Sequence, residues 1–231
     1  MTTLLKQVGD AHVRNRVGAV LLAAGEGSRL GKVPKCLLSL QGVPLIKRHM
    51  IALSSAGVDE VVVVTGYYHA NVEPVVESFP VTVVRNPAPE QGQQSSVRLG
   101  LEALTNTLDL VLIMLADQPL LTADDLTELI STFKKRSPGT SIVYPEVNEQ
   151  RGNPVIFSGE LIAQLLAADN KIGCRKFIDD NPSLVHKLIT ENDHFVLDID
   201  TPEDVSAFEK RTGWKLTLPV LTQALKSLST Y

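Results

Sequence analysis

Two groups of side chains in this sequence have the types and spacing for phosphate chemistry, and the first is a glycine loop. The run Ala24–Gly31 has glycines at positions 25, 27 and 31, and Lys32 and Lys35 follow it. Glycine lets the backbone take positive φ angles and brings its N–H groups close to a phosphate. Arg29 and Lys35 supply the positive charge that a triphosphate requires. We therefore expect a phosphate-binding loop here, in preference to an ordinary glycine-rich turn.

Two common phosphate loops do not fit this run. A P-loop needs G-x-x-x-x-G-K-[ST], but Gly27 lies one position too close to Gly31, and Val33 stands where a hydroxyl residue is required. A dinucleotide fingerprint needs a third glycine where this chain has Leu30. Two prolines also keep the chain extended until about Leu45, so no helix is expected to start in the loop.

The second group consists of carboxylates that follow apolar runs. Asp117 comes directly after the apolar run Leu110–Ala116. A hard cation such as Mg²⁺ prefers carboxylate oxygen, although an aspartate here could equally cap a turn. Further on, Thr201 and Asp204 are typical of a helix N-cap and its capping box, which leaves Asp200 without a capping role.

The elements that must position these groups alternate between strand and helix patterns. The expected strands are Val17–Ala23, Glu60–Thr65, Val81–Asn86, Leu110–Leu115, Ser141–Tyr144, Asn153–Phe157, Leu184–Leu188 and Phe195–Asp198. The expected helices are Leu45–Ala56, Ser95–Leu104, Ala123–Lys135, Leu161–Ala168 and Pro202–Arg211. Nearly continuous apolar strands indicate burial on both faces, hence a Rossmann-like, doubly wound α/β fold with a mainly parallel sheet flanked by helices. Ligands of such folds bind beyond the carboxyl ends of the strands, where both groups stand.

Bulk properties limit the function classes and the organisation of the chain. With 231 residues and a net charge of −4, the chain lacks the basic face of a general nucleic-acid binder. No apolar run approaches the length of a membrane span, and Cys36 and Cys174 are read as reduced thiols, so a cytoplasmic protein without nucleic-acid or membrane partners is expected. We expect one domain over residues 17–211, an N-terminal appendage over 1–16, and a C-terminal helical appendage over 212–231 whose helix starts after Pro219.

The run Leu21–Ile46 (LLAAGEGSRLGKVPKCLLSLQGVPLI) resembles the signature of the nucleotidyltransferases, LAAGxGxRM followed by K-x-L and G-x-P-L. Leu30 replaces the more usual Met. The resemblance implies a fold of the nucleotide-diphospho-sugar transferase type, catalysis by Lys35, Arg29 and Asp117, and Mg²⁺ held by Asp117 and Asp200. Arg29 would bind the outer phosphates and Lys35 would stabilise charge on the α-phosphate. The implied nucleotide-binding residues are Leu22, Ala23, Ala24, Gly25, Gly27, Ser28, Arg29, Lys35, Gly66, Asn86, Gly92, Ser95 and Ser96.

Later motifs resemble one branch, the molybdenum cofactor cytidylyltransferases. These motifs are Arg151–Val155 (RGNPV) and Gly173–Phe177 (GCRKF). Ala24 and Gln118 stand where guanine-using relatives have glycine and threonine, which favours cytosine. The implied reaction transfers CMP from CTP to the terminal phosphate of molybdopterin and releases pyrophosphate. Arg151, Asn153 and Arg175 are the candidate acceptor-binding residues, and a molybdenum hydroxylase apo-enzyme is a candidate partner.

Three alternatives remain open from the sequence. The enzyme could use GTP, or it could act on another phosphorylated acceptor such as a sugar phosphate or phospholactate. A chaperone that delivers the finished cofactor is a third alternative, but a pure carrier would not need both Lys35 and Asp117.

Overall fold

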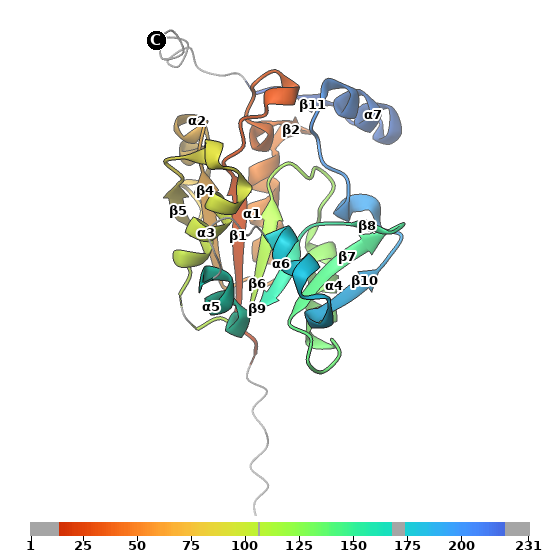
Figure 1. Cartoon of the computed structure of the whole chain (residues 1–231). Coiled ribbons are helices and arrows are strands. Elements are labelled where there is room, and N and C mark those ends of the chain that lie inside the picture. The colour runs from red at the N-terminus through yellow and green to blue at the C-terminus, as the bar shows by residue number, and fades with distance from the viewer. Residues whose placement is uncertain (1–13, 106, 168–173, 220–231) are drawn as a thin grey trace, which may run out of the picture.

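A seven-strand path forms the centre of the molecule in the computed structural model, which describes residues 14–105, 107–167 and 174–219 (Figure 1). The order across the sheet is β10-β7-β9-β6-β1-β4-β5, and the short β8 pairs with β7. The bounds are β1 Val17–Ala23, β4 Glu60–Thr65, β5 Thr82–Arg85, β6 Leu110–Leu115, β7 Ile142–Val147, β8 Gln150–Arg151, β9 Val155–Ser158 and β10 Val185–Ile189. The sheet is mainly parallel, as predicted, with β9 antiparallel to both β6 and β7.

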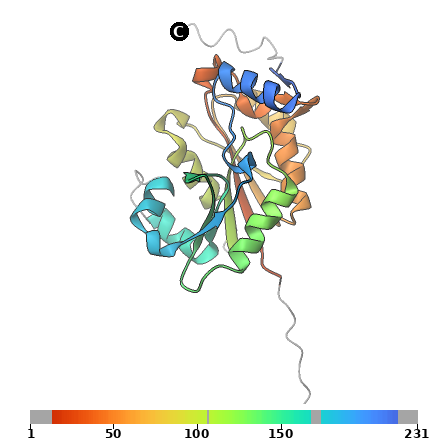
Figure 2. The ribbon, with the colours of Figure 1, turned by 90° about the vertical axis from the view of Figure 1, so that its right-hand side faces the viewer.

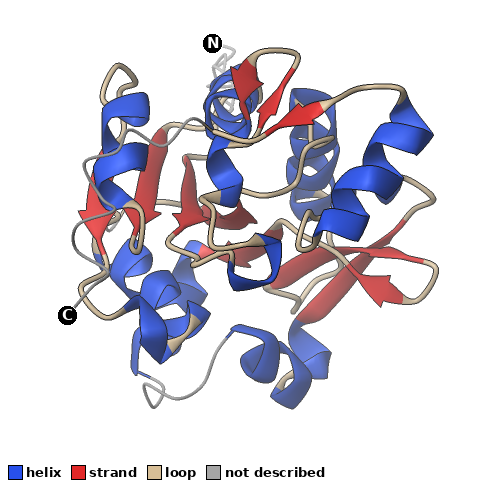
Figure 3. Cartoon of the chain, turned by 90° about the horizontal axis from the view of Figure 1, so that it is seen from above, coloured by secondary structure: helices blue, strands red, loops and turns tan. Residues whose placement is uncertain are grey.

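Helices cover both faces of this sheet (Figure 3). One face packs against α1 Leu45–Ser55, α2 His69–Val76 and α4 Ala123–Lys134. The other face packs against α3 Gln93–Glu102, α5 Gly159–Ala167 and α6 Cys174–Asp180. The buried side chains of β1 alternate between the two cores, because successive residues of a strand point to opposite faces. The predicted α/β architecture is therefore confirmed.

A smaller layer stands beyond the carboxyl ends of the central strands. It consists of α7 Pro202–Thr212 and a three-stranded sheet of β2 Ser39–Leu40, β3 Val43–Pro44 and β11 Leu216–Thr217, and α7 lies at the top end of the molecule in Figure 2. Leu30, Leu40 and Phe208 belong to the separate apolar cluster that holds this layer together. The layer positions the segment after β1 over the end of the sheet.

Several predicted elements differ from the structure. The strand expected over Phe195–Asp198 is wrong: Asp193–Phe195 is a 3-10 helix, and the N–H groups of residues 196 and 197 donate back to the carbonyl of Asp193. Helices α2 and α6 and the small sheet were not predicted. Strand β11 lies within the predicted C-terminal appendage, whereas the helix predicted after Pro219 and residues 1–13 of the N-terminal appendage lie outside the described residues. Within the described residues, no helix is long and apolar enough to cross a membrane.

Candidate active site

A cavity of about 300 Å³ opens beyond the carboxyl ends of β1 and β6. Its walls come from the loops after these two strands, from the start of α3 and from the segment before α7. The lining residues are Leu22, Ala23, Ala24, Gly25, Lys35, Cys36, Pro89, Gly92, Gln93, Ser96, Leu115, Ala116, Asp117, Asp198 and Asp200. A doubly wound fold is expected to bind its ligand at this place, and the sequence predicted a site here.

The glycine loop that borders the cavity uses its glycines in different ways. Gly27 (φ 63°) and Gly31 (φ 81°) flank the 3-10 helix Ser28–Leu30, and both have the predicted left-handed conformation. A Cβ at position 27 would lie 2.1 Å from the carbonyl oxygen of Val33, so only glycine fits there. The prediction of positive φ is wrong for Gly25, which instead leaves open space beside the cavity.

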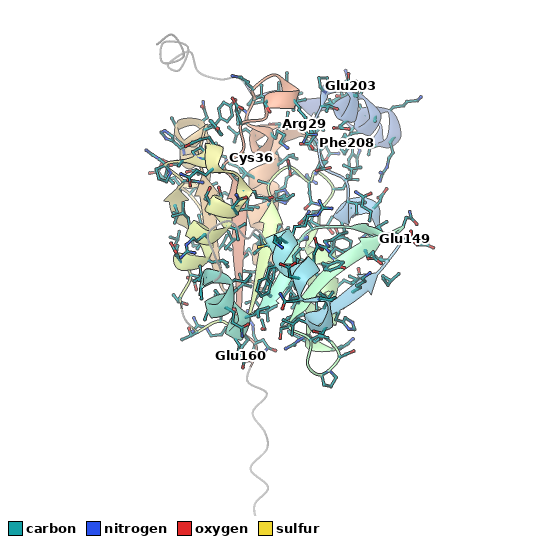
Figure 4. All side chains as sticks on the ribbon, viewed as in Figure 1. Arg29, Cys36, Glu149, Glu160, Glu203 and Phe208 are labelled. Carbon is teal, nitrogen blue, oxygen red and sulfur yellow. The ribbon has the colours of Figure 1, made fainter. Side chains whose placement is uncertain are left out.

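Four of the predicted charged residues meet at one end of the cavity. Lys35, at the start of a 3-10 helix (Lys35–Leu37), donates from Nζ to Asp117 Oδ2 and, at 2.7 Å, to Asp200 Oδ1. Arg29 Nη2 lies 2.5 Å from Asp200 Oδ2 (Figure 4 shows Arg29). Burial alone would lower the pKa of the Lys35 ammonium, but Asp117 and Asp200 outweigh it and raise that pKa. Lys35 is therefore held charged between two carboxylates that are 82 and 165 residues away in the chain.

The donor set at this end of the cavity suits a divalent cation. Asp117 Oδ1 is buried and has no hydrogen-bond partner, so one carboxylate oxygen is left for a ligand. Asp198, which the sequence reasoning missed, adds a third carboxylate to the lining. Partial burial, together with the charges of Asp117 and Asp200, raises the pKa of Asp198. No preformed group of three acidic or other metal ligands occurs among the described residues, so oxygens from water or from a bound phosphate would have to complete the shell of a metal held here.

Cys36 also lines the cavity but is not poised as a nucleophile (Figure 4). Burial, reinforced by the charge of Asp117, raises the pKa of its thiol to about 12. Because the thiolate is the reactive form, this cysteine is inert at neutral pH.

Other predicted nucleotide-binding residues support the cavity from behind. Asn86 is buried and donates to the hydroxyls of Ser95 and Ser96, at 2.8 Å and 2.9 Å, which ties the loop after β5 to the start of α3. Of these three, only Ser96 lines the cavity. Gly66 lies behind Ala24, where a Cβ would come 2.8 Å from the Ala24 methyl.

Gln118 does not face the cavity. Its side chain is buried, and Nε2 donates to the carbonyl of Phe195 at 3.0 Å. The hypothesis that Gln118 favours cytosine therefore finds no contact in this structure, because the amide is used to hold a neighbouring segment. Ala24 does line the cavity and remains the candidate for base selection.

A second cavity, of about 700 Å³, adjoins the first, and Gln93 and Leu115 line both. The three predicted acceptor residues Arg151, Asn153 and Arg175 all line it, although they come from different elements. Arg151 Nη2 lies 2.6 Å from Asp179 Oδ1, and the guanidinium carbon lies 4.7 Å from the centre of the Tyr144 ring. Lys187 adds another cation to the lining, and sequence reasoning missed it because it lies on a strand with no motif.

Comparison with known proteins agrees with this geometry. The family model of the MobA-like NTP transferase domain matches residues 19–187. The chain is 31% identical over 201 residues to nicotine blue oxidoreductase of Paenarthrobacter nicotinovorans, covering 82% of this chain and 94% of that protein. It is 29% identical over 149 residues to the bifunctional protein GlmU of Mycobacterium marinum, but these cover 60% of this chain and only 30% of that protein.

Solved structures share the fold. A nucleotidyl transferase from Methanothermobacter thermautotroptrophicus superposes with a TM-score of 0.70 at 25% identity, covering 86% of this chain and 98% of that one. Rv0371c from Mycobacterium tuberculosis H37Rv, solved in complex with manganese, superposes with a TM-score of 0.66 at 22% identity over 85% of this chain and 98% of that one. Nucleotidyltransferases of this fold use divalent metals, and the carboxylates found here suit that chemistry. The chain belongs to the MobA-like NTP transferase family, and its fold and family are those of a nucleotidyltransferase.

Proposed function

We propose that this nucleotidyltransferase transfers CMP from CTP to the terminal phosphate of molybdopterin. The observation that carries the proposal is the convergence of Lys35, Asp117 and Asp200 at the end of one cavity. Directly beside it is a second cavity, whose lining carries three cations (Arg151, Arg175 and Lys187) together with three carboxylates (Glu146, Glu149 and Asp179). One cavity is suited to the nucleotide and the other to an anionic acceptor. Gln93 and Leu115 line both cavities, so the two substrates would meet there.

Asp117 and Asp200 would hold Mg²⁺, with Asp117 offering its unpartnered buried oxygen. When bound, this cation would neutralise charge on the triphosphate and so make the α-phosphorus more open to attack. The Lys35 ammonium is the counter-ion of the same two carboxylates in this structure. With those carboxylates engaged elsewhere, Lys35 is free to turn to the α-phosphate, as its motif predicts.

The base of the nucleotide fits between the glycine loop and the start of α3. The backbone from Leu22 to Gly25 lines one side, and Gln93 and Ser96 line the other. The methyl group of Ala24 reduces the space beside the base, which disfavours a purine more than a pyrimidine, and such steric discrimination is typically worth on the order of 1–3 kcal/mol.

The acceptor fits in the second cavity. Arg151 Nη1 is buried without a hydrogen-bond partner, and Arg175 lines the same wall. A guanidinium pair binds a phosphate group or the oxygens of a pterin ring with well-defined geometry. The Tyr144 ring is buried and packs beneath the Arg151 guanidinium, so it helps to hold that group in place.

The chemical step needs positioning more than proton transfer. An oxygen of the acceptor phosphate attacks the α-phosphorus of CTP, a new P–O bond forms, and the bond to the β-phosphate breaks to release pyrophosphate. The acceptor is already ionised at neutral pH, so no general base is required. Lys35 would stabilise the charge that develops on the α-phosphate, and Arg29 would do so on the leaving pyrophosphate.

A nucleotide panel tests this assignment. Purified protein in Mg²⁺ is heated with CTP, GTP, ATP or UTP, and the shift of Tm is compared across the four. The proposal expects the largest stabilisation from CTP. Equal stabilisation by GTP would contradict the cytidylyl assignment, while the same panel with sugar phosphate, phospholactate or molybdopterin present would identify the acceptor.

A second candidate function is an oxidoreductase, and the similarity to nicotine blue oxidoreductase over 94% of that protein favours it. Against it, the glycine loop departs from a dinucleotide fingerprint at Leu30. Two assays on the same protein distinguish these functions. Loss of the colour of nicotine blue with NADH or NADPH would support the oxidoreductase, whereas CTP-dependent release of pyrophosphate would support the transferase.

A further inference from the structure

The segment 192–200 carries Asp198 and Asp200 to the cavity without belonging to any strand. A segment of this kind gains no support from a ladder of sheet hydrogen bonds, yet its carboxylates must keep a fixed distance from Asp117. Phe195, at the centre of the segment, is fully buried and belongs to the core beneath α4. The remaining question is what fixes the polar part of the segment.

One set of contacts joins the segment to the start of α4. Asp125 is 5% exposed and is the N3 residue of the capping box of that helix. Its Oδ1 accepts a hydrogen bond from Asn192 Nδ2 at 2.6 Å, and its Oδ2 lies 3.0 Å from His194 Nδ1. Because a carboxylate only accepts, His194 must carry its proton on Nδ1. The capping box needs Oδ2 alone, so the contacts with Asn192 and His194 go beyond what capping requires.

A second set of contacts joins the segment to the loop after β6. Gln118 Nε2 donates to the carbonyl of Phe195 at 3.0 Å, and the N–H of Ile199 donates to the carbonyl of Asp117 at 3.2 Å. The Gln118 Oε1 is buried and has no partner. Burying an amide oxygen without a hydrogen-bond partner costs free energy of folding. The hydrogen bond that Nε2 donates to Phe195 is therefore the contact that accounts for a glutamine at this position.

We propose that Gln118, Asp125, Asn192 and His194 form a clamp that fixes Asp200 relative to Asp117 and thereby sets the affinity of the site for a divalent cation. The inference rests on the metal role given to Asp117 and Asp200 in the proposed function. None of the four clamp residues lines either cavity, so all are positioning residues. Residues that orient metal ligands from behind typically contribute about 10- to 100-fold in metal affinity.

The test compares binding of Mn²⁺ alone by the wild type, His194→Ala and His194→Asn, using the electron paramagnetic resonance signal of free Mn²⁺. An asparagine amide can place an N–H near the position of the histidine Nδ1, so it should restore the contact with Asp125. His186→Ala is the matched control, because His186 is also half-buried but its ring hydrogen-bonds, among the described residues, to Ser137 alone. Tm is measured for every variant.

We expect His194→Ala to weaken Mn²⁺ binding about tenfold, His194→Asn to bind within about threefold of the wild type, and His186→Ala to leave binding unchanged. Should His194→Ala not fold, Gln118→Leu takes its place, because leucine keeps the buried volume and removes the donor to Phe195. Unchanged Mn²⁺ affinity in the folded alanine or leucine variant would overturn the clamp. Equal loss in His194→Ala and His194→Asn would also overturn it. A wild type that binds no Mn²⁺ would instead remove the metal site itself, and the inference with it.

Discussion

Replacing Lys35 by methionine removes one ammonium from between two carboxylates and keeps most of the side-chain volume. In this structure the Lys35 Nζ donates to both Asp117 and Asp200. Without it, two neighbouring carboxylates lose their shared counter-ion. We expect the variant to be less stable than the wild type in the absence of metal, and we expect a divalent cation to reverse that loss.

The size of the loss follows from the exposure of the three side chains. Removing one member of a fully buried ion pair costs roughly 3–5 kcal/mol. Here Lys35, Asp117 and Asp200 keep 17%, 15% and 24% of their side-chain surface exposed, and Arg29 still pairs with Asp200. Solvent and Arg29 screen part of the repulsion, so about 1–3 kcal/mol is expected. Because the ammonium and the metal compete for the same carboxylates, the same free energy should appear as Mn²⁺ binding roughly 5- to 150-fold tighter in Lys35→Met.

The assay is urea unfolding of the wild type and Lys35→Met, each with and without saturating Mn²⁺. Lys32→Met is the control, because Lys32 pairs with Glu26 at 3.3 Å at the surface and should contribute little. The two stability curves should separate without metal and converge with it. A deficit of the same size in both conditions would refute the view that Lys35 and the metal share these carboxylates.

Three further outcomes are expected. Asp117→Asn should abolish turnover while Tm falls by only a few degrees, since the amide keeps the shape but not the charge; turnover near the wild-type rate in saturating Mg²⁺ would remove Asp117 from the metal site. Arg29→Ala should raise the KM for CTP and lower kcat, because Arg29 binds the outer phosphates in both the ground and transition states; an unchanged KM would contradict this role. Burial alone would raise the pKa of Asp125, but hydrogen bonds from His194, Thr122 and Asn192 outweigh it and lower that pKa below 3.8. The ionised Asp125 therefore stabilises the fold above pH 3.8, and this stabilisation is lost as the pH falls through the lowered pKa. Asp125→Asn should flatten the acid side of the curve of unfolding free energy against pH, measured by urea unfolding. The same acid dependence in the variant and the wild type would contradict this prediction.

Strong local signals account for what the sequence predicted well. Buried apolar runs identified β1, β4 and β6, and the capping pair Thr201 and Asp204 marked the start of α7. The contact between Lys35 and Asp117 follows from their places in the segments after β1 and β6, which the topology brings together. Residues of this kind are predictable because the local motif and the position at the end of a strand both indicate a place beside the ligand cavity.

The features that were missed depend on tertiary contacts. The run Phe195–Leu197 is apolar like a short buried strand, but the burial of Phe195 and its hydrogen bonds to Gln118 and Asn153 take the backbone out of the sheet. For the same reason Gln118 was assigned to base selection, since no local pattern shows which way a side chain after a strand turns. Asp198 was missed because only the folded segment brings it beside Asp117 and Asp200.

The most direct test of the central claim is the release of pyrophosphate by purified protein supplied with CTP, Mg²⁺ and molybdopterin, with the nucleotide-bearing product identified by mass spectrometry. The account predicts one pyrophosphate for each CMP attached to the acceptor phosphate, a higher kcat/KM for CTP than for GTP, and no product with Asp117→Asn. Turnover in which no nucleotide reaches any phosphorylated acceptor, or an equal yield from Asp117→Asn, would contradict it.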